Sequence, residues 1–551
     1  MAGDARAEYV IERQQQMEND RVVYDSHCQE IAERVLPRQD TFTRKRGMEG
    51  EKRAEKIFDA TAPLALDRAA SAIDSLITPT TQQYHKLGPE DDRLQYDRDT
   101  VLYCDELTKQ LFRMRYRPEA NYSSQAHECY VSLMAFGTLA QFTNDELGIG
   151  TRYKSIGMSQ MYIAEDHAGV IDYNHRKFKL AARQAAQKFG LANLPQKIRD
   201  EAEKHPFQKF EFIHCVKPNE ERVHSARGYK SWPHISYYVS YEGRKCLSEG
   251  GYRTKPYQVS RHVTAPDETY GRSPAMIVLA DIKMLNEMEK TTIRAAHKVV
   301  DPPLLAFGDG FMNIINTRPN AINYGGVDAN GRQLVHPLKT GANLPLVFEM
   351  SEGRRKVIND AFYVTLFQIL VQNPQMTATE ALIRAQEKGQ LLAPTVGRQE
   401  SEYLGPQILR ELDILALSGR LPQMPRRLAM SGGGLKVIYT SPLARLRRAE
   451  DGVAMLRSME SATSILQAKP DSQILDNIDE DAWIREMWEI NGAPLKVLRP
   501  SELVDQIREE RKQAQQNQAT LDGANTAANA AKNLAKAQES VGTMIPPGIL
   551  Q

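Results

Sequence analysis

The chain has 551 residues, with 71 Lys and Arg against 70 Asp and Glu and five cysteines. One hydrophobic core stops growing beyond about 250–300 residues, so this length predicts two or more cores. The formal charge of +1 argues against a protein whose whole surface grips nucleic acid, and any such contact must be local. The odd number of widely spaced cysteines, with no C-x-x-C pair, argues against a disulfide framework and indicates reduced thiols.

The N-terminal sequence MAGDARAEYVIERQQQ lacks the apolar core of a signal peptide. No run in the chain approaches the ~20 apolar residues that a membrane span needs. We therefore expect synthesis and assembly in the cytoplasm.

The first third of the chain is predicted to be rich in helix. Apolar residues recur at helical spacing from Asp4 to Leu36, and Pro37 ends the pattern. A second helix is predicted to begin at Thr61, and further helical patterns cover Val101–Phe112 and Gln125–Phe136. From Leu139 to Tyr270 the pattern changes to short alternating runs separated by Gly, Asn and Pro, which predict strands and turns around one helix over Leu180–Phe189. The fold class predicted is therefore α+β.

The stretch from Tyr270 to Val371 predicts a helical hairpin. Its first helix starts after Pro274 and stops at Asp301-Pro302-Pro303, because proline cannot continue a helix. Residues 301–345 are rich in Gly, Asn and Pro, which is typical of tight turns and short strands. An apolar pattern over Ser351–Val371 then predicts a returning helix.

The charges of the first hairpin helix separate onto one face at about 100° per residue. The charged arc contains Lys283, Glu287, Lys290, Arg294, His297 and Lys298. The apolar arc opposite contains Ile282, Leu285, Met288, Ile293, Ala296 and Val299. A single charged face is ordinarily a solvated surface. Repeated around a ring, it would line a tube.

Beyond the hairpin, Thr377 and Glu380 form a capping box that predicts a helix start. That helix gives way at Gly389, and a further helix is predicted to run to Leu417 with a kink at Pro406. LKVIYTS then predicts a strand, Leu443–Leu466 a helix, and the segment with Trp483 and Trp488 another helix. From Gln513 the sequence turns to Gln, Asn and Ala, which cannot bury a core alone. That tail is expected to be either disordered or helical only against neighbours.

No enzymatic motif emerges from the sequence. Gly326–Gln333 has the glycine spacing of a phosphate-binding loop but lacks its Lys-Ser/Thr, and Gly271-Arg-Ser-Pro-Ala lacks the second glycine of a nucleophile elbow. The histidines and cysteine nearest to a metal cluster match no zinc spacing and are interpreted as ordinary strand residues: His214, Cys215, His224 and His234. We predict no catalytic residue, no metal site and no cofactor.

Five sequence blocks carry a family resemblance. In chain order they are IFDATAPLALDRAASAIDSLITPTTQQYHKL (57–87), YGRSPA, LADIKMLNEMEKTTIRAAHKVVDPPL, MTATEALIRAQEK (376–388) and TSPLARLRRAED (440–451). Together, over roughly Ala5 to Arg511, they resemble the portal (head-to-tail connector) family of short-tailed, podovirus-type bacteriophages. The resemblance implies a viral portal fold assembled as a ring, with an α-rich body, a mixed α/β wing, a two-helix stem, a small α/β clip and a helical crown.

On this resemblance the chain divides into seven segments. They are the N-terminal helices and wing/body (1–273), first stem helix (274–300), clip (301–345), second stem helix (346–373), tunnel loop with long wing helix (374–430), return strand with crown (431–512) and low-complexity tail (513–551). The charged arc of the first stem helix is expected to face the DNA channel. The tunnel loop, Gln386–Gln399, is expected to project into the channel, with Leu391 and Leu392 at its tip between Lys388 and Arg398.

The resemblance further implies a dodecameric ring at one capsid vertex of the virion. Double-stranded DNA would pass through it without sequence preference during packaging, retention and ejection. The implied partners are the terminase packaging motor, the major capsid and scaffolding proteins, a tail adaptor protein, and internal core or ejection proteins. An alternative is a different head or tail assembly protein of the same particle, such as a tail-tube or scaffold component, which would lack a central DNA path. A soluble nucleic-acid enzyme is disfavoured by the absent motifs.

Overall fold

The computed structural model describes residues 4–44, 50–95, 97–146, 150–306, 316, 322, 327, 330–338, 344–368, 394–468, 477–490, 498–499 and 501–542. The chain divides into two compact units. The first contains residues 1–86, 106–422 and 437–450, and the second contains residues 87–105, 423–436 and 451–551. The predicted sites that the structure describes, on the first stem helix and at Arg398, lie in the first unit.

Two helices, α1 (Ala5–Asp20) and α2 (Val22–Val35), replace the single N-terminal helix that the sequence predicted. The break is at Arg21, whose side chain is buried and donates a hydrogen bond to the Met161 carbonyl oxygen. The guanidinium also pairs with Asp25 at 2.8 Å and lies 4.1 Å from the centroid of the Tyr162 ring. A tertiary contact of this kind leaves no trace in helical periodicity, which explains the missed break.

The main core is built on small side chains. Helix α3 (Thr61–Ile77) buries Ala62, Ala65, Ala69 and Ala70, and α5 (Tyr122–Phe136) packs against it. Side chains this small let helices approach closely. Between them in sequence lie β1 (His85–Pro89) and α4 (Arg98–Arg115). Short 3₁₀ helices cover Pro37–Gln39, Asp92–Leu94, Pro118–Ala120, Leu191–Asn193 and Gly228–Ser231.

Two antiparallel sheets follow. The first has the strand order β3 (Gly150–Ser155), β2 (Thr138–Glu146), β9 (Tyr257–Arg261). The second has the order β4 (Met161–Glu165), β5 (Ile171–Ala181), β6 (Lys209–Pro218), β7 (His234–Ser240), β8 (Lys245–Tyr252). Strands and helices therefore coexist in one unit, and the predicted α+β class is confirmed.

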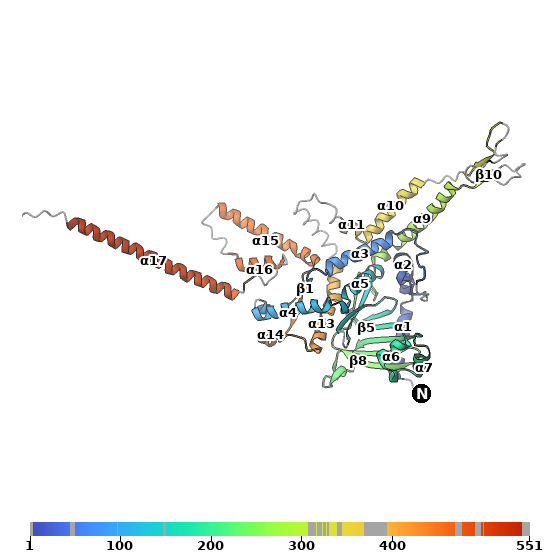
Figure 1. Ribbon diagram of the computed structural model, residues 1–551, viewed down its shortest axis with the longest axis horizontal. Helices are drawn as coiled ribbons and strands as arrows, with labels where there is room; N and C mark the ends of the chain where they lie inside the picture. The colour runs from blue at the N-terminus through green and yellow to red at the C-terminus, as the bar shows by residue number, and fades with distance from the viewer. Residues whose placement is uncertain are drawn as a thin grey trace, which may run out of the picture. The chain divides into compact units, whose positions relative to one another are not determined.

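Helices cover both faces of the five-stranded sheet. Helices α6 (Ala182–Phe189) and α7 (Gln196–Lys204) pack with Phe178, Phe210 and Phe212 on one face (Figure 1). On the other face α1 packs Ala7, Val10 and Ile11 against Ile213, Cys215 and Val239. The sequence predicted α6 but not α7, a nine-residue helix of which only Ile198 is buried.

A short helix, α8 (Pro274–Ile277), leads into α9 (Leu279–Val300), which stops at Asp301 as predicted. The strands β10 (Leu304–Ala306) and β11 (Val335–Pro337) pair beyond it. Helix α10 (Leu344–Ala361) returns alongside α9 (Figure 1). The helix predicted over 346–373 is interrupted, because Tyr363 has a φ of 60° and separates α10 from α11 (Val364–Gln368).

A π-helix over Gln399–Leu404 precedes α13 (Gly405–Leu417), so the distortion predicted at Pro406 lies one turn earlier. Proline cannot donate a hydrogen bond, which frees carbonyl oxygens in the preceding turn. The Glu400 carbonyl oxygen shows the π-helical spacing, because it accepts a hydrogen bond from the Gly405 N–H, five residues later, and a second from the Tyr439 hydroxyl at 2.7 Å.

The remaining elements are α14 (Arg426–Met430), β12 (Leu435–Tyr439), which pairs with β1, α15 (Pro442–Ala468), α16 (Glu480–Ile490) and α17 (Ser501–Gly542). Helix α17 includes most of the predicted low-complexity tail. Of its described side chains from Leu503 to Lys536, none is buried. The described part of the tail is therefore a helix without buried side chains.

Candidate functional site

The first half of α9 docks on the body of the first unit. Ile282 and Leu285 are buried in the main core, and the Asn286 side-chain oxygen accepts hydrogen bonds from the backbone N–H groups of Phe58 and Asp59. The predicted apolar arc therefore packs within the chain over this half. Beyond it the same arc is uncovered, because Ile293 is 45% and Val299 50% exposed.

The predicted charged arc divides in the same way. The Lys283 ammonium group pairs with Glu30 on α2 and holds the pKa of that carboxyl below its ordinary value. Lys290 lies 2.9 Å from Glu287 and 5.6 Å from the centroid of the Phe58 ring. These contacts explain why the lower part of the arc carries little free charge.

The upper part of the arc is different. Arg294, His297 and Lys298 are exposed, and none of them has an ion-pair partner within the described ranges of the chain. A cation without a fixed partner is available to an external anion. The structure thus separates the six predicted residues into a paired set near the body and a free set toward the end of α9.

Three carboxylates on the body and on α9 fix α10. Arg354 Nη1 lies 2.5 Å from Asp281 Oδ1, and Arg355 Nη2 lies 2.8 Å from both Glu289 Oε1 and Asp59 Oδ2. Burial raises the pKa of Asp59, but hydrogen bonds from Thr61 and Arg355 outweigh it and hold that pKa below its ordinary value. The sequence analysis did not single out these arginines, because they lie in the polar second half of α10 and their partners Asp59, Asp281 and Glu289 are distant in sequence.

The predicted tunnel loop is only partly described. Lys388, Leu391 and Leu392 lie outside the described residues. The end of the predicted loop is corrected, because residues 394–398, the described part of this stretch, are helical. Arg398 Nη1 donates a hydrogen bond to Thr264 Oγ1 at 2.9 Å and lies 3.9 Å from Glu402 Oε1.

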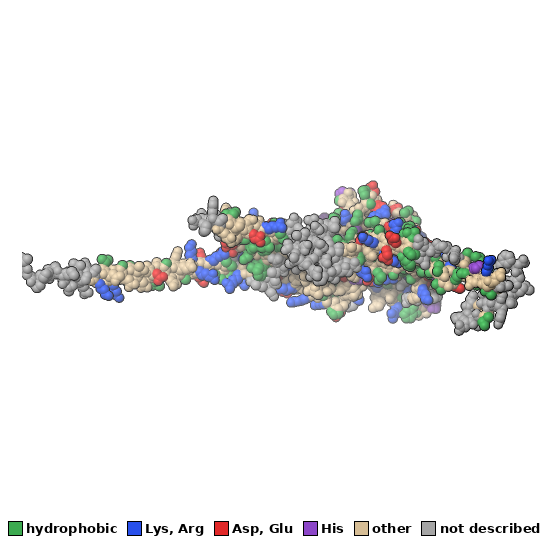
Figure 2. Space-filling view, turned by 90° about the horizontal axis from the view of Figure 1, so that it is seen from above, with side chains coloured by type: hydrophobic (Ala, Val, Ile, Leu, Met, Phe, Trp, Pro, Cys, Tyr) green, Lys and Arg blue, Asp and Glu red, His purple; other side chains and the backbone are tan. Residues whose placement is uncertain are grey.

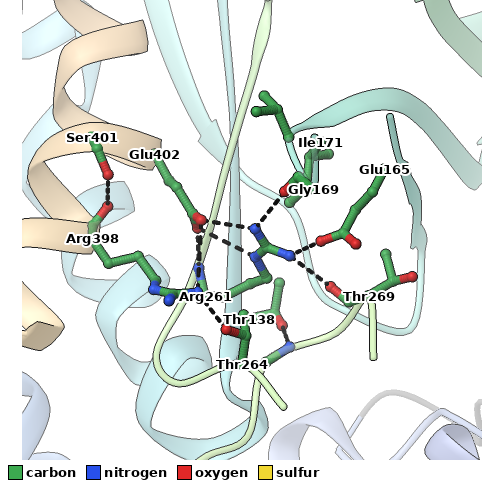
Figure 3. Close-up of polar contacts among 12 residues, drawn as sticks. Thr138, Glu165, Gly169, Ile171, Arg261, Thr264, Thr269, Arg398, Ser401 and Glu402 are labelled. Atoms are coloured by element: carbon green, nitrogen blue, oxygen red, sulfur yellow. Dashed lines mark hydrogen bonds and ion pairs between the residues drawn. The ribbon is translucent and has the colours of Figure 1, made fainter. Parts of the chain in front are cut away.

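Arg398 borders a buried arginine that joins three segments (Figure 3). Arg261, at the end of β9, is 5% exposed and directs its guanidinium between Glu402 and Glu165. Its Nη2 lies 2.8 Å from Glu402 Oε1 and 3.1 Å from the Gly169 carbonyl oxygen. Glu402 also accepts the Arg261 backbone N–H at 2.9 Å. The Glu402 carboxylate therefore accepts hydrogen bonds from both the backbone N–H and the guanidinium group of Arg261.

A cleft of about 530 Å³ opens beside this cluster. Its charged and hydroxyl-bearing lining residues are Glu165, Arg261, Thr264, Asp267, Glu268, Arg398, Ser401 and Glu402. Most of these charges are already paired, since Glu268 holds Arg272 and Glu165 holds Arg261. We therefore assign the cluster to fixing the helical segment over residues 394–404 against β9. Sequence reasoning missed it because Arg261 and Glu402 are 141 residues apart.

His214, one of the residues considered above as a metal ligand, has a structural role. His214 on β6 is buried, with Nδ1 2.6 Å from the Tyr257 hydroxyl and Nε2 2.9 Å from Ser236 Oγ. Burial lowers its pKa well below the ordinary value. Within the described ranges, no group of three or more His, Cys, Asp or Glu side chains is arranged to hold a metal ion. No helix in the part of the chain that the structure describes has the length and apolar content to span a membrane.

The surface carries mixed charge. Figure 2 shows Lys and Arg side chains interspersed with Asp and Glu side chains on the face drawn, as the near-neutral composition requires. A surface of this kind does not bind polyanions generally. The exposed cations at the end of α9 are therefore a local concentration of positive charge.

Comparison with known proteins gives relatives along almost the whole chain. It is 27% identical over 547 residues to the portal protein of Salmonella phage epsilon15, covering 98% of this chain and 97% of the relative. It is 26% identical over 537 residues to the probable portal protein of Bordetella phage BPP-1, covering 96% of each.

Two solved structures are similar at lower levels. One is a virion of a native gene transfer agent particle, with 11% identity, a TM-score of 0.32 and coverage of 84% of this chain and 99% of that one. The other is the neck of an empty gene transfer agent particle, with 12% identity, a TM-score of 0.33 and coverage of 82% and 96%. Scores this low support no inference about the fold.

The family comparison is more direct. The model of the bacteriophage head to tail connecting protein family matches residues 7–498, which is most of the 551-residue chain. The resemblance predicted from the five sequence blocks is thereby confirmed. The chain belongs to the family of bacteriophage head to tail connecting proteins, whose relatives in phages epsilon15 and BPP-1 are a portal and a probable portal protein.

Proposed function

We propose that this chain is the subunit of a portal ring, which occupies one vertex of the capsid and lets double-stranded DNA pass during packaging, retention and ejection. Family membership and the end-to-end match to two portal relatives support this role. The part played by the chain is passive, and a separate motor supplies the energy.

The observation that supports ring assembly is the uncovered apolar surface of the α9–α10 hairpin. Beyond the part of α9 that contacts the body, Ile293 and Val299 are exposed, and so are Leu346, Phe348 and Met350 at the adjacent end of α10. The exposed fraction of each side chain is 45–53%. Large apolar side chains gathered on two adjacent helices mark an interaction surface. Neighbouring copies of the same hairpin, related by rotation, would cover it through heterologous contacts that close into a ring.

The free cations of α9 supply the DNA-facing part of the proposal. Arg294, His297 and Lys298 lie toward the end of the helix and have no partner among the described residues. Each phosphate contact adds affinity and salt dependence, so a few cations per subunit attract DNA without fixing it in place. Contacts to phosphate carry no sequence information, which suits a channel.

The other segments are proposed by family analogy. Residues 301–345 are the clip that meets a tail adaptor, 274–300 and 346–373 the stem, 374–430 the tunnel loop and wing helix, and 431–512 the crown. The proposed partners are the terminase motor, the capsid and scaffolding proteins, and internal core or ejection proteins. The proposed copy number is twelve.

Negative-stain electron microscopy of the purified full-length chain tests the proposal. We expect rings with a central hole. Filaments would instead support the alternative of a tail-tube or scaffold component, and single small particles at every concentration would contradict both assembly roles.

A further inference from the structure

Two basic side chains converge on an aromatic cluster far from α9 in the fold. Lys188 on α6 places its Nζ 4.2 Å from the ring centroid of Tyr238 and 5.6 Å from that of Phe178. Arg176 on β5 places its Cζ 4.7 Å from the centroid of the same Phe178 ring. Helix α6 packs on this face of the sheet, so the two cations share one aromatic surface.

The strand register places Arg176 in a continuous row. Arg176, His214 and Tyr238 are directly opposite one another on β5, β6 and β7. The His214 and Tyr238 rings are stacked, with centroids 3.9 Å apart and an interplanar angle of 2°. Arg176 therefore lies beside a stacked pair of rings, of which His214 is buried.

A third cation reaches the row from the other sheet. Lys154 on β3 is directly opposite Phe142 on β2. The Phe142 ring lies 4.8 Å from the ring centroid of Tyr257 and 5.7 Å from that of His214. Lys154 is exposed on β3, and partial desolvation and Arg176 lower its pKa, so the charges of Lys154, Arg176 and Lys188 act on one another from three different elements.

These three cations have no carboxylate partner within the described part of the chain. The acidic residue that acts on them, Glu146, is itself paired with Arg152 at 3.1 Å. Burial, Arg176 and Lys154 lower the pKa of Lys188 to about 8, and burial and Arg176 lower that of Lys154. The cluster therefore carries uncompensated positive charge that repels itself.

The aromatic rings explain part of this arrangement. The attraction between a cation and an aromatic face helps to hold Lys188 over the Tyr238 ring. The rings do not remove the repulsion among three like charges, however. They also leave no room for a stacked base on Tyr238, because His214 and Lys188 both lie about 4 Å from its centroid and must occupy opposite faces.

We propose that Lys154, Arg176 and Lys188 form a binding site for a single oxyanion, either a phosphate or a carboxylate group. The guanidinium fork of Arg176 offers paired donors of the geometry that such groups accept, and among the described residues its Nε has no hydrogen-bond partner. The two ammonium groups add point charges. The site is independent of the α9 surface proposed for DNA.

The test uses the full-length protein and inorganic phosphate as probe. Calorimetric titration at constant ionic strength measures phosphate affinity for the wild type, Arg176→Gln and Lys188→Gln. Lys179→Gln is the matched control, because Lys179 lies on the same strand but pairs with Glu211 at 3.2 Å. We expect each cluster variant to lose about tenfold in affinity and the control to bind normally.

A second measurement does not depend on any variant folding. Lys188 should be acylated faster than ordinary exposed lysines such as Lys197 at pH 8, and phosphate should slow its modification selectively, as followed by peptide mass spectrometry. Competition by a glutamate-rich peptide would identify a protein carboxylate as the source of the anion, and binding of phosphate alone would identify the free ion. If neither probe protects Lys188 in the wild type, the proposal is wrong.

Discussion

Arg115 on α4 and Glu411 on α13 form an ion pair in which both side chains are completely buried. Nη2 lies 2.5 Å from Oε2, and Nε lies 3.0 Å from Oε1. The Tyr84 hydroxyl accepts a hydrogen bond from Arg115 Nη1, and the Tyr153 hydroxyl donates one to Glu411. Because every charged group has partners, the network specifies how these elements meet in the core.

Replacing Glu411 by Ala should destabilise the first unit strongly. The change leaves the Arg115 guanidinium buried without a counter-charge, which costs about 3–5 kcal/mol. Chemical denaturation of the monomer measures the loss. The control is Arg152→Ala, which breaks the exposed pair with Glu146 and should cost at most about 1 kcal/mol. Equal losses in the two variants would contradict this account of the network.

Gly271 should tolerate no side chain. A Cβ atom there would lie 2.0 Å from the Gly137 carbonyl oxygen, so Gly271→Ala must displace backbone and should cost about 3 kcal/mol or more. Gly353 in α10 is the control, because a Cβ atom there meets nothing within 4 Å. Gly353→Ala should stabilise the helix by about 0.5–1 kcal/mol. Thermal unfolding of both variants checks the opposite signs.

Stability should fall as the pH is lowered from about 6.5 to 4. Burial and then Arg398 lower the pKa of His262 to about 4, although a backbone hydrogen bond with Arg272 opposes the shift. Burial, Arg13 and Lys217 lower that of His175 to about 3. Between pH 6.5 and 4 the unfolded chain binds protons at these residues and the folded chain does not, so stability is present above 6.5 and lost on acidification.

The variant His262→Gln isolates one of these contributions. It should flatten the decline in unfolding free energy between pH 6.5 and 4 by about 3 kcal/mol, since one pKa unit corresponds to about 1.4 kcal/mol. Denaturant titrations at several pH values give the slope. A slope identical to that of the wild type would show that His262 is protonated in the folded state.

The free cations of α9 should act on DNA and not on assembly. The double variant Arg294→Gln, Lys298→Gln should form rings of normal size but bind duplex DNA more weakly. The slope of log affinity against log salt concentration should become shallower by about 0.9 for each phosphate that is no longer neutralised. Lys283→Gln is the control, because Lys283 is already paired with Glu30. A full salt dependence in the double variant would remove these residues from the DNA path.

The uncovered apolar side chains of the hairpin should be required for the ring. Phe348→Glu places a charge in the proposed contact between copies, so we expect single subunits in place of rings by light scattering and microscopy. Phe207→Glu alters a residue that is 73% exposed elsewhere in the unit and should leave rings intact. Rings formed by the Phe348 variant would exclude this surface as the interface.

The sequence correctly predicted those helix boundaries that nearby residues determine. Ser273 caps α8 through the Met276 N–H and the two prolines after Asp301 end α9, so this boundary was correct. The break at Tyr363 was missed because neither glycine nor proline marks it. The positions where helices are interrupted by tertiary contacts, such as Arg21, carry no local signal.

For the candidate site, too, the sequence predicted the local pattern of residues but not their long-range contacts. Periodicity placed the six charged residues on one arc of α9, but it could not show that Lys283 would be neutralised by Glu30, a residue some 250 positions earlier. Arg398 was singled out for its place beside a predicted loop. Glu402, four residues later, is a neighbour that helical spacing could have predicted. The hydrogen bond to Thr264 could not be predicted in this way, because the two residues are 134 positions apart and meet through the packing of β9 against the π-helix.

The distance along the chain between Arg115 and Glu411, 296 residues, also sets an order of events during synthesis. At about 5–20 residues per second, the ribosome reaches Glu411 roughly 15–60 s after Arg115 has been made. Until then the Arg115 guanidinium lacks its counter-charge, and this part of the core of the first unit stays incomplete. The buried ion pair can therefore form only after 411 of the 551 residues have been made.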